Sequence, residues 1–506
     1  MKTIVSMVHL VMLTPVAALA AARPCDNLSS LGLPETTITM AQTVAPGALI
    51  LPGRFPPDAW TDLPAFCRVV ARLKPSSDSD IKIEVWLPSE GWNGRYLAVG
   101  NGGWAGVIRY RPMARALRRG YATSSTDTGH TGNGGDASFA LGHPEKLIDF
   151  AYRSVHEMAV KTKAIIEAFY ETPTQYSYWS GCSTGGRQGL VEAQRFPTDF
   201  DGIVAIAPAF NQPRLNVSFI WVAQAMLNDP ASYIPPSKYP MIHDAVLQAC
   251  DARDGVLDGV VDDPTRCRFD PEALRCGDAD APTCLTAPQV EAARKIYAGP
   301  KNSRTLQQIA PGLEPGSELG WAMLAAGPNA HPIGNTYFKF VVFKDTDWNF
   351  RTLDFDRDVA LVDQLDDGLL AATDPDLTEF AARGGKLILI HGWSDPGIGP
   401  RYSINYYKSV VERMGGSATT DDFIRLFMAP GMAHCRGGEG PDTVDPLPLM
   451  EQWVEQGIVP DRMIASRSRR GEADRTRPLC SYPQVARYRG TGSTDDAANF
   501  ACVNPN

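Results

Sequence analysis

The sequence lacks an excess of positive charge. It has 48 basic residues against 57 acidic ones and a formal net charge of −9. This balance argues against a surface that binds nucleic acid or anionic lipid. It also lacks internal repeats and low-complexity tracts. Of its 506 residues, 44% are hydrophobic and 21% are charged, so a large packed core is expected and global disorder is excluded.

Long apolar runs are also missing, except at the N-terminus. Lys2 precedes an apolar stretch, Ile4 to Ala20, that ends in Ala18-Leu19-Ala20. This pattern predicts a secretory signal over residues 1–20. A retained anchor is the alternative, although the run is short for a membrane span. We therefore expect a protein exported to the periplasm or the medium, where disulfides persist and the ten cysteines can pair.

Short apolar strands alternate with helices in two parts of the chain. The first part predicts strands at 81–87 (half-exposed), 96–99, 121–127, 176–179 and 203–207, and helices over 147–169 and from Gly181 to about Arg195. The second predicts strands at 386–390 and 423–428 and helices near 402–414 and 447–454. Between them lies a stretch rich in Pro, Gly, Asp and Cys.

This alternation predicts an α/β fold with a mostly parallel sheet covered on both faces. We expect a catalytic domain made of 21–209 and 376–506. Residues 210–375 would form an inserted lid domain.

A glycine-rich turn carries the candidate nucleophile. Gly181-Cys182-Ser183-Thr184-Gly185 is a G-x-S-x-G element between a predicted strand and a predicted helix, as this motif requires. A nucleophile on such a turn has a strained backbone, and glycine neighbours avoid collisions. Ser183 is the predicted nucleophile; the alternative is a tight turn with a capping serine.

The loops after two later strands carry a candidate acid and base. Asp395 follows the 386–390 strand, and His434 follows the 423–428 strand. A serine hydroxyl needs a base to take its proton and a carboxylate to orient that base. The order Ser183, Asp395, His434 is that of the α/β-hydrolase fold.

The other histidines are weaker candidates for the base. His391 ends the strand before Asp395 and is expected either to pack beside the site or to support one of its residues. His130 and His143 lie in a glycine-rich loop that could line it.

Two cysteines adjoin these residues. Cys182 precedes Ser183, and Cys435 follows His434. A bond between them would close a loop of roughly 250 residues, worth on the order of 5 kcal/mol. It would also hold two catalytic segments in register, where a slip of about 1 Å can cost a hundredfold in rate. The alternative is a staple that only happens to lie near the site.

These pairs, with Asp395 between them, resemble the CS-D-HC arrangement of the tannase and feruloyl esterase family of α/β-hydrolases. The family includes fungal feruloyl esterases, tannases and the bacterial mono(hydroxyethyl) terephthalate hydrolase. Further matching motifs cover most of the mature chain and are specific for the family, much less for the substrate. They are Trp92 to Arg95, Gly181 to Arg187, Arg195 to Pro197, His391 to Asp395, Pro430 to Cys435 and Thr476 to Cys480.

The resemblance implies an oxyanion hole formed by the backbone N–H groups of Thr184 and Gly103. It also implies four further disulfides: Cys25–Cys67, Cys250–Cys267, Cys276–Cys284 and Cys480–Cys502.

Three aspartates lie close together in the inserted segment: Asp251, Asp254 and Asp258. Their carboxylates repel one another unless a cation or solvent separates them, and oxygen ligands with intervening glycines suit Ca²⁺. The spacing is not that of an EF-hand. The resemblance implies structural calcium bound by these carboxylates and the carbonyls of Val256 and Val260, which would hold the insertion rigid. The alternative is a solvated acidic turn.

Aromatic residues are dense between Tyr337 and Phe350. They could form a pocket for a phenolic acyl group or simply the core of the lid. In the family that the sequence resembles, the terephthalate branch uses a lid arginine to hold the free carboxylate of its substrate. No matching arginine lies between 335 and 350, and Arg351 is the nearest. This favours hydroxycinnamate or gallate esters.

The sequence therefore predicts a secreted serine esterase that cleaves aromatic esters of the feruloyl type through an acyl-enzyme. Its partner would be a small aromatic ester or a plant cell-wall phenolic ester, with no redox or nucleotide cofactor. A tannase acting on galloyl esters and a mono(hydroxyethyl) terephthalate hydrolase are the alternatives. A catalytically inactive binding protein and an acyltransferase represent other functional classes.

Overall fold

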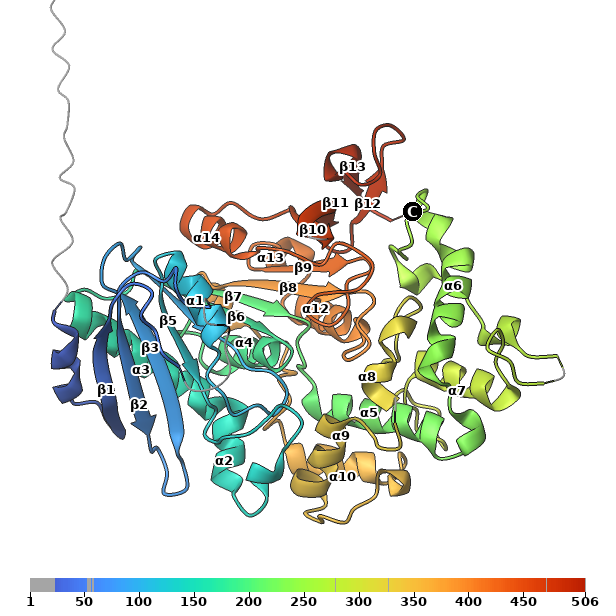
Figure 1. Ribbon diagram of the computed structural model, residues 1–506, viewed down its shortest axis with the longest axis horizontal. Helices are drawn as coiled ribbons and strands as arrows, with labels where there is room; N and C mark the ends of the chain where they lie inside the picture. The colour runs from blue at the N-terminus through green and yellow to red at the C-terminus, as the bar shows by residue number, and fades with distance from the viewer. Residues whose placement is uncertain are drawn as a thin grey trace, which may run out of the picture.

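The largest sheet of the described chain has nine strands (Figure 1). The computed structural model describes residues 23–51, 56, 59–277, 279–325, 327–469 and 471–505. The predicted signal sequence, residues 1–20, lies outside them. The strand order is β1-β2-β3-β5-β4-β6-β7-β8-β9. The first three strands pair antiparallel, as β3 does with β5, and every pair from β5 to β9 is parallel. The predicted α/β class with a mostly parallel sheet is confirmed.

The strands have the following limits. The large sheet comprises β1 (Thr36–Val44), β2 (Phe66–Leu73), β3 (Ile81–Pro88), β4 (Arg95–Val99), β5 (Ala122–Thr126), β6 (Tyr176–Cys182), β7 (Gly202–Ile206), β8 (Lys386–Gly392) and β9 (Ile424–Ala429). Two small hairpins near the C-terminus comprise β10 (Arg462–Arg469) with β11 (Glu472–Cys480) and β12 (Val485–Tyr488) with β13 (Phe500–Val503).

Helices cover both faces of the sheet. One face packs against α3 (Ser154–Tyr170), α4 (Thr184–Arg195) and α12 (Arg401–Arg413), and the other against α1 (Tyr110–Arg118) and α14 (Leu447–Gln456). Successive side chains of a strand point to opposite faces. Leu387 and Leu389 accordingly lie in one core, and Ile388 and Ile390 in the other. This is why β8 is an unbroken apolar run.

The segment between β7 and β8 forms a largely helical body beside the sheet (Figure 1). The predicted limits 210–375 fall within this segment. No helix among the described residues is long and apolar enough to cross a membrane. The helices of the segment are α5 (Gln212–Leu227), α6 (Tyr239–Cys250), α7 (Ala287–Ala298), α8 (Ala322–Ala325), α9 (Pro332–Thr336), α10 (Asp358–Asp366) and α11 (Thr378–Ala382). Outside it, α2 (Pro144–Ile148) and α13 (Ser417–Thr420) complete the α-helices of the described chain.

The helix predicted over 147–169 is interrupted. A π-helical turn, Asp149–Arg153, separates α2 from α3. The buried guanidinium of Arg187 donates to the carbonyls of Ala151 and Phe150 at 2.9 and 3.3 Å. Those contacts come from a distant segment and favour a widened turn at this point.

The strand predicted as half-exposed, β3, is almost fully buried. It lies inside the sheet between β2 and β5 rather than at an edge. Its Glu84 accepts a hydrogen bond from Arg68 at 2.7 Å and another from Trp86 at 2.7 Å. Burial of this charged residue is therefore compensated by an ion pair.

Candidate active site

Three predicted residues lie at one edge of the sheet. Ser183 follows β6, Asp395 follows β8 and His434 follows β9. These strands belong to the parallel part of the sheet, in the order β6-β7-β8-β9, so their carboxyl ends meet at the same edge. In Figure 1 the arrowheads of these strands point toward the inserted helices.

Ser183 stands on a sharp turn between β6 and α4. Its φ is 62° and its ψ is −122°, a backbone conformation that residues other than glycine rarely adopt. The N–H of Ser183 donates to the carbonyl of Ile206 at 2.9 Å, which attaches the turn to the neighbouring strand β7. A Cβ on Gly181 would lie 2.4 Å from the carbonyl oxygen of Gly185, so this position requires glycine. The strain expected from the sequence is present at Ser183.

Asp395 orients the imidazole of His434. Its Oδ2 lies 2.8 Å from Nδ1 of His434, and its side chain is fully buried. Its Oδ1 accepts hydrogen bonds from the N–H groups of Gly397 and Ile398 at 2.8 and 2.9 Å. These bonds fix the carboxylate and leave Nε2 of His434 as the nitrogen not bound to Asp395.

The two groups stabilise each other's charge. Burial alone would raise the pKa of Asp395, but the attraction of His434 and the hydrogen bonds from His391 and His434 hold it well below its usual value. Burial alone would lower the pKa of His434, but the charge and hydrogen bond of Asp395 raise it. A histidine in this setting is stabilised in the protonated form that it would assume after taking a proton from serine.

His391 contributes more than packing. Its Nε2 lies 3.2 Å from Oδ2 of Asp395 and 2.9 Å from the carbonyl oxygen of Ile398. Both partners are acceptors, so Nε2 carries the proton, and Nδ1 accepts from the Ser403 hydroxyl at 2.7 Å. The sequence predicted that His391 either packs beside the site or supports one of its residues, and the contact with the carboxylate agrees with the second option.

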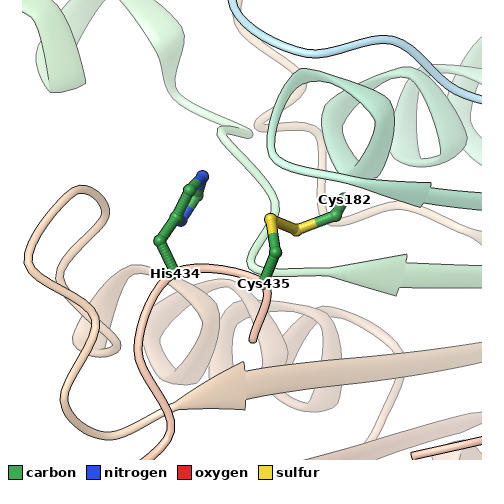
Figure 2. Close-up of side chains that lie close together, drawn as sticks. All are labelled: Cys182, His434 and Cys435. Carbon is green, nitrogen blue, oxygen red and sulfur yellow. A yellow bond between two sulfur atoms is a disulfide. The ribbon is translucent and has the colours of Figure 1, made fainter. Parts of the chain in front are cut away.

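A disulfide joins the segments that carry Ser183 and His434. Cys182 and Cys435 are bonded, with their Cα atoms 6.0 Å apart. Figure 2 shows the imidazole of His434 beside this disulfide, and the ligand atoms of the three residues lie within 4.8 Å of one another. The sulfur atoms are bonded to each other, so neither is a thiolate that could hold a metal. The other four disulfides are also present, which confirms the predicted pairing: Cys25–Cys67, Cys250–Cys267, Cys276–Cys284 and Cys480–Cys502.

In the described part of the chain, the Ser183 hydroxyl and the candidate base His434 are not hydrogen-bonded to each other. Among the described residues, the imidazole of His434 makes its side-chain hydrogen bond to Asp395 and none to Ser183. Catalytic hydrogen bonds of this kind are often long and tighten when substrate binds. The disulfide limits how far the two segments can separate.

The two predicted oxyanion donors are neighbours. The hydroxyl of Thr184 donates to the carbonyl of Gly103 at 2.9 Å. Thr184 is the first residue of α4, so the helix offers no partner for its N–H. Gly103 has a φ of 55°, and a Cβ there would lie 2.3 Å from the carbonyl oxygen of Gly134. Glycine is therefore required at this position, where the loop packs closely against Gly134.

The two histidines of the glycine-rich loop have other roles. Nε2 of His130 lies 2.7 Å from the carbonyl oxygen of Trp104, and its ring stacks on Phe139 at 3.6 Å. It thereby anchors the loop that carries Gly103. His143 is partly exposed and lies 3.0 Å from Asp78.

The aspartate loop of the insertion packs against the C-terminal hairpin. Asp251 accepts from the N–H groups of Asp258 and Gly259 at 3.2 and 3.0 Å, and Asp254 from that of Val256 at 2.9 Å. Burial raises the pKa of Asp254 to about 6, and the charges of Asp258 and Asp251 add to the rise.

This concentration of buried negative charge and oxygen donors fits a calcium ion. Arg475 and Arg477 already contact the carboxylate of Asp258, so a cation would share it with them.

The aromatic residues of the inserted segment mainly form a core that also includes Trp104 and Phe150. Tyr337, Phe338, Trp348 and Phe350 are buried in one hydrophobic cluster. Arg351 is exposed, covers the ring of Phe350 and donates to the carbonyl of Leu227 at 3.0 Å. It is therefore held at the surface by contacts within the inserted segment.

Comparison with known proteins gives consistent matches along the chain. A family model described as "Tannase and feruloyl esterase" matches residues 67–503. An uncharacterized esterase of Xanthomonas campestris pv. campestris is 43% identical over 96% of this chain and 92% of its own length. A protein of Aspergillus oryzae named "Probable feruloyl esterase B-1" is 34% identical over 88% of this chain and 85% of its own.

Solved structures agree with these sequence matches. The crystal structure of feruloyl esterase B from Aspergillus oryzae is 31% identical and covers 95% of this chain and 99% of its own, with a TM-score of 0.89. Tannin acyl hydrolase from Aspergillus niger is 25% identical and covers 96% and 94%, with a TM-score of 0.78.

Proposed function

The chain belongs to the tannase and feruloyl esterase family and is a carboxylic ester hydrolase with an α/β-hydrolase fold, and on this premise we propose that it cleaves esters of hydroxylated aromatic acids. Ser183 is the nucleophile, His434 the base and Asp395 the residue that orients it. The observation that carries this assignment is the 2.8 Å hydrogen bond between Asp395 and His434, beside a disulfide that reaches the Ser183 turn.

The first half of the reaction transfers the acyl group to the enzyme. Nε2 of His434 takes the hydroxyl proton of Ser183 as Oγ attacks the ester carbonyl. The N–H groups of Thr184 and Gly103 bind the negative charge that develops on the carbonyl oxygen. His434 then gives its proton to the leaving alcohol, the C–O bond to that alcohol breaks, and an acyl-enzyme remains.

The second half releases the acid. His434 takes a proton from water, and the water oxygen attacks the carbonyl carbon of the acyl group that is bonded to Oγ of Ser183. Collapse of the second tetrahedral intermediate breaks the bond to Oγ, which recovers its proton from His434. Because an ordinary alcohol could replace this water, the ratio of alcoholysis to hydrolysis separates an esterase from an acyltransferase.

Feruloyl esters are the first choice of substrate and galloyl esters the second. The high structural similarity to feruloyl esterase B supports the former, and that to tannin acyl hydrolase the latter. Arg351 lies at the surface of the lid, which counts against a terephthalate-type site built on it. Membership of an esterase family leaves the inactive binding protein without support.

The substrate is tested by comparing kcat/KM for methyl ferulate, methyl gallate and mono(hydroxyethyl) terephthalate on the same preparation. We expect methyl ferulate to give the highest value, and Ser183→Ala to abolish turnover of all three esters. Preference for methyl gallate would make the protein a tannase. A folded enzyme that hydrolyses none of them would refute the proposal.

We also propose that Ca²⁺ binds the 251–260 loop through Asp251, Asp254, Asp258 and the carbonyls of Val256 and Val260. There it would neutralise the crowded carboxylates and stiffen the insertion. The protein is further proposed to be exported after loss of residues 1–20, in keeping with its five disulfides.

A further inference from the structure

Polar atoms without partners gather on the lid helices α5 and α9. They are Oε1 of Gln212, both amide atoms of Asn216 and Nδ1 of His331, all buried and without a hydrogen bond among the described residues. Gln212 is 2% exposed and Asn216 0%. Buried polar atoms are normally paired, and each unpaired one costs about 1–3 kcal/mol. These unpaired atoms are therefore candidates for binding a polar group of a ligand.

The two amide side chains of the set lie on one face of α5. Gln212, Asn216 and Phe219 follow one another at spacings of four and three residues, which places them on the same side of the helix. The ring of His331 lies 4.6 Å from that of Phe219. A Cβ on Gly334 would lie 3.3 Å from the carbonyl oxygen of Asn216 and 2.9 Å from Cβ of Phe219. The start of α9 thus packs against this face and brings His331 to it.

The face begins beside the nucleophile. The N–H of Ala209 donates to the carbonyl of Ser183 at 3.1 Å, and Gln212 opens α5 three residues later. With a rise of about 1.5 Å per residue, Asn216 lies about 6 Å beyond Gln212 along the helix axis.

The same face reaches the catalytic histidine. Phe219 lines a small cavity together with Gly397. A Cβ on Gly397 would lie 3.7 Å from Cγ of His434. Burial lowers the pKa of His331 to about 4, and repulsion from His434 adds to the fall. His331 is therefore neutral at ordinary pH.

The start of α9 also contacts the glycine loop that supplies an oxyanion donor. The indole N–H of Trp104 donates to the carbonyl of Ile333 at 3.1 Å. A Cβ on Gly135 would lie 3.0 Å from Cβ of Pro332. His331, next to Pro332, consequently lies at the junction between the lid and the catalytic loops.

The chemistry of this set suits a neutral group that both donates and accepts. Two amides and a neutral imidazole offer donors and acceptors but no positive charge, whereas a carboxylate is best bound by a cation. A phenol both donates and accepts. We infer that Gln212, Asn216 and His331 form a subsite for a ring hydroxyl of the aromatic acyl group. This subsite rests on the proposed function and specifies its substrate class.

A site built to bind a hydroxyl discriminates against substrates without one, because its polar atoms then stay unpaired in the transition state. Methyl ferulate and methyl 3,4-dimethoxycinnamate differ only in whether the ring hydroxyl is free or methylated. The ratio of their kcat/KM values therefore reports on the subsite.

The test compares this ratio in the wild type, Asn216→Leu, His331→Phe and a control. The control is Thr162→Val, which removes another buried hydroxyl, on α3. We expect the wild type to prefer methyl ferulate by about 5- to 150-fold. The ratio should fall toward one in Asn216→Leu, fall in the same direction in His331→Phe, and stay at the wild-type value in Thr162→Val.

The inference is overturned if the folded wild type hydrolyses both esters equally well, or if both lid variants lower the two rates in the same proportion. If Asn216→Leu does not fold, His331→Phe decides the matter alone. A wild-type enzyme that hydrolyses neither aromatic ester but cleaves 4-nitrophenyl acetate would instead refute the proposed function. That result differs from a loss of hydroxyl preference.

Discussion

Cys182 and Cys435 are bonded to each other across 253 residues of sequence, and each directly adjoins a residue of the proposed triad. The relationship couples the fold to the chemistry. A cross-link of this span removes much of the freedom of the unfolded chain. The same bond keeps the turn of Ser183 and the loop of His434 within reach of each other.

Removal of this disulfide should reduce both stability and rate. We expect the double variant Cys182→Ala/Cys435→Ala to lose about 2–5 kcal/mol of unfolding free energy. Its kcat/KM should fall about 100-fold at a temperature where it stays folded, because the two loops lose their register. Denaturant titration and initial rates measure the two effects.

The matched control is Cys480→Ala/Cys502→Ala, which opens a disulfide of the C-terminal hairpins. This variant should be less stable than the wild type but equally active. If the two double variants show the same loss of rate, the Cys182–Cys435 bridge has no catalytic role.

His391 should act as a positioning residue for Asp395. His391→Phe removes the Nε2–H donor and should lower kcat about 10- to 100-fold, since a buried carboxylate loses one of its hydrogen bonds. His391→Gln retains an N–H donor and should recover most of the rate. Equal losses in both variants, with unchanged pH profiles, would indicate a purely structural role.

The pH dependence should follow the ionisation of His434. Only the neutral imidazole can take the proton of Ser183, so kcat/KM rises with pH as His434 loses its own proton. Because Asp395 raises the pKa of His434, the midpoint of this rise should lie above 6.5. Asp395→Asn removes the negative charge and should shift the midpoint to lower pH, with a loss of about 10⁴-fold in kcat. An unshifted midpoint would mean that another group titrates.

Calcium should stabilise the protein without taking part in catalysis. With a Kd of about 10⁻⁴ M, 10 mM Ca²⁺ would add roughly 2–3 kcal/mol of stability relative to excess EDTA. Thermal melting measures the shift, which Asp254→Asn should abolish. Asp347→Asn, at an exposed lid aspartate, should retain it. A wild-type melting temperature that is the same in EDTA and calcium would contradict the proposal.

The positions of the triad residues could be predicted because their signals are local. A glycine motif after a strand indicated Ser183, and the ends of two apolar strands indicated Asp395 and His434. The order of these segments along a parallel sheet then placed them at one edge.

Features that depend on contacts between residues far apart in the sequence could not be predicted from local sequence patterns. The π-helical turn at Asp149–Arg153 accompanies carbonyl contacts with Arg187 in another helix. The burial of Glu84 depends on Arg68 from the neighbouring strand. The lack of partners for Asn216 emerges only when α5 and α9 are packed together.

The most direct test of the central claim is to trap the acyl-enzyme. The wild-type enzyme is mixed with 4-nitrophenyl ferulate, release of 4-nitrophenol is followed before the steady state, and the acid-quenched protein is digested for mass spectrometry. We expect a burst of about one equivalent, ferulate attached to the peptide that contains Ser183, and neither signal in Ser183→Ala. Ferulate attached to a different residue, or full hydrolytic activity in Ser183→Ala, would contradict it.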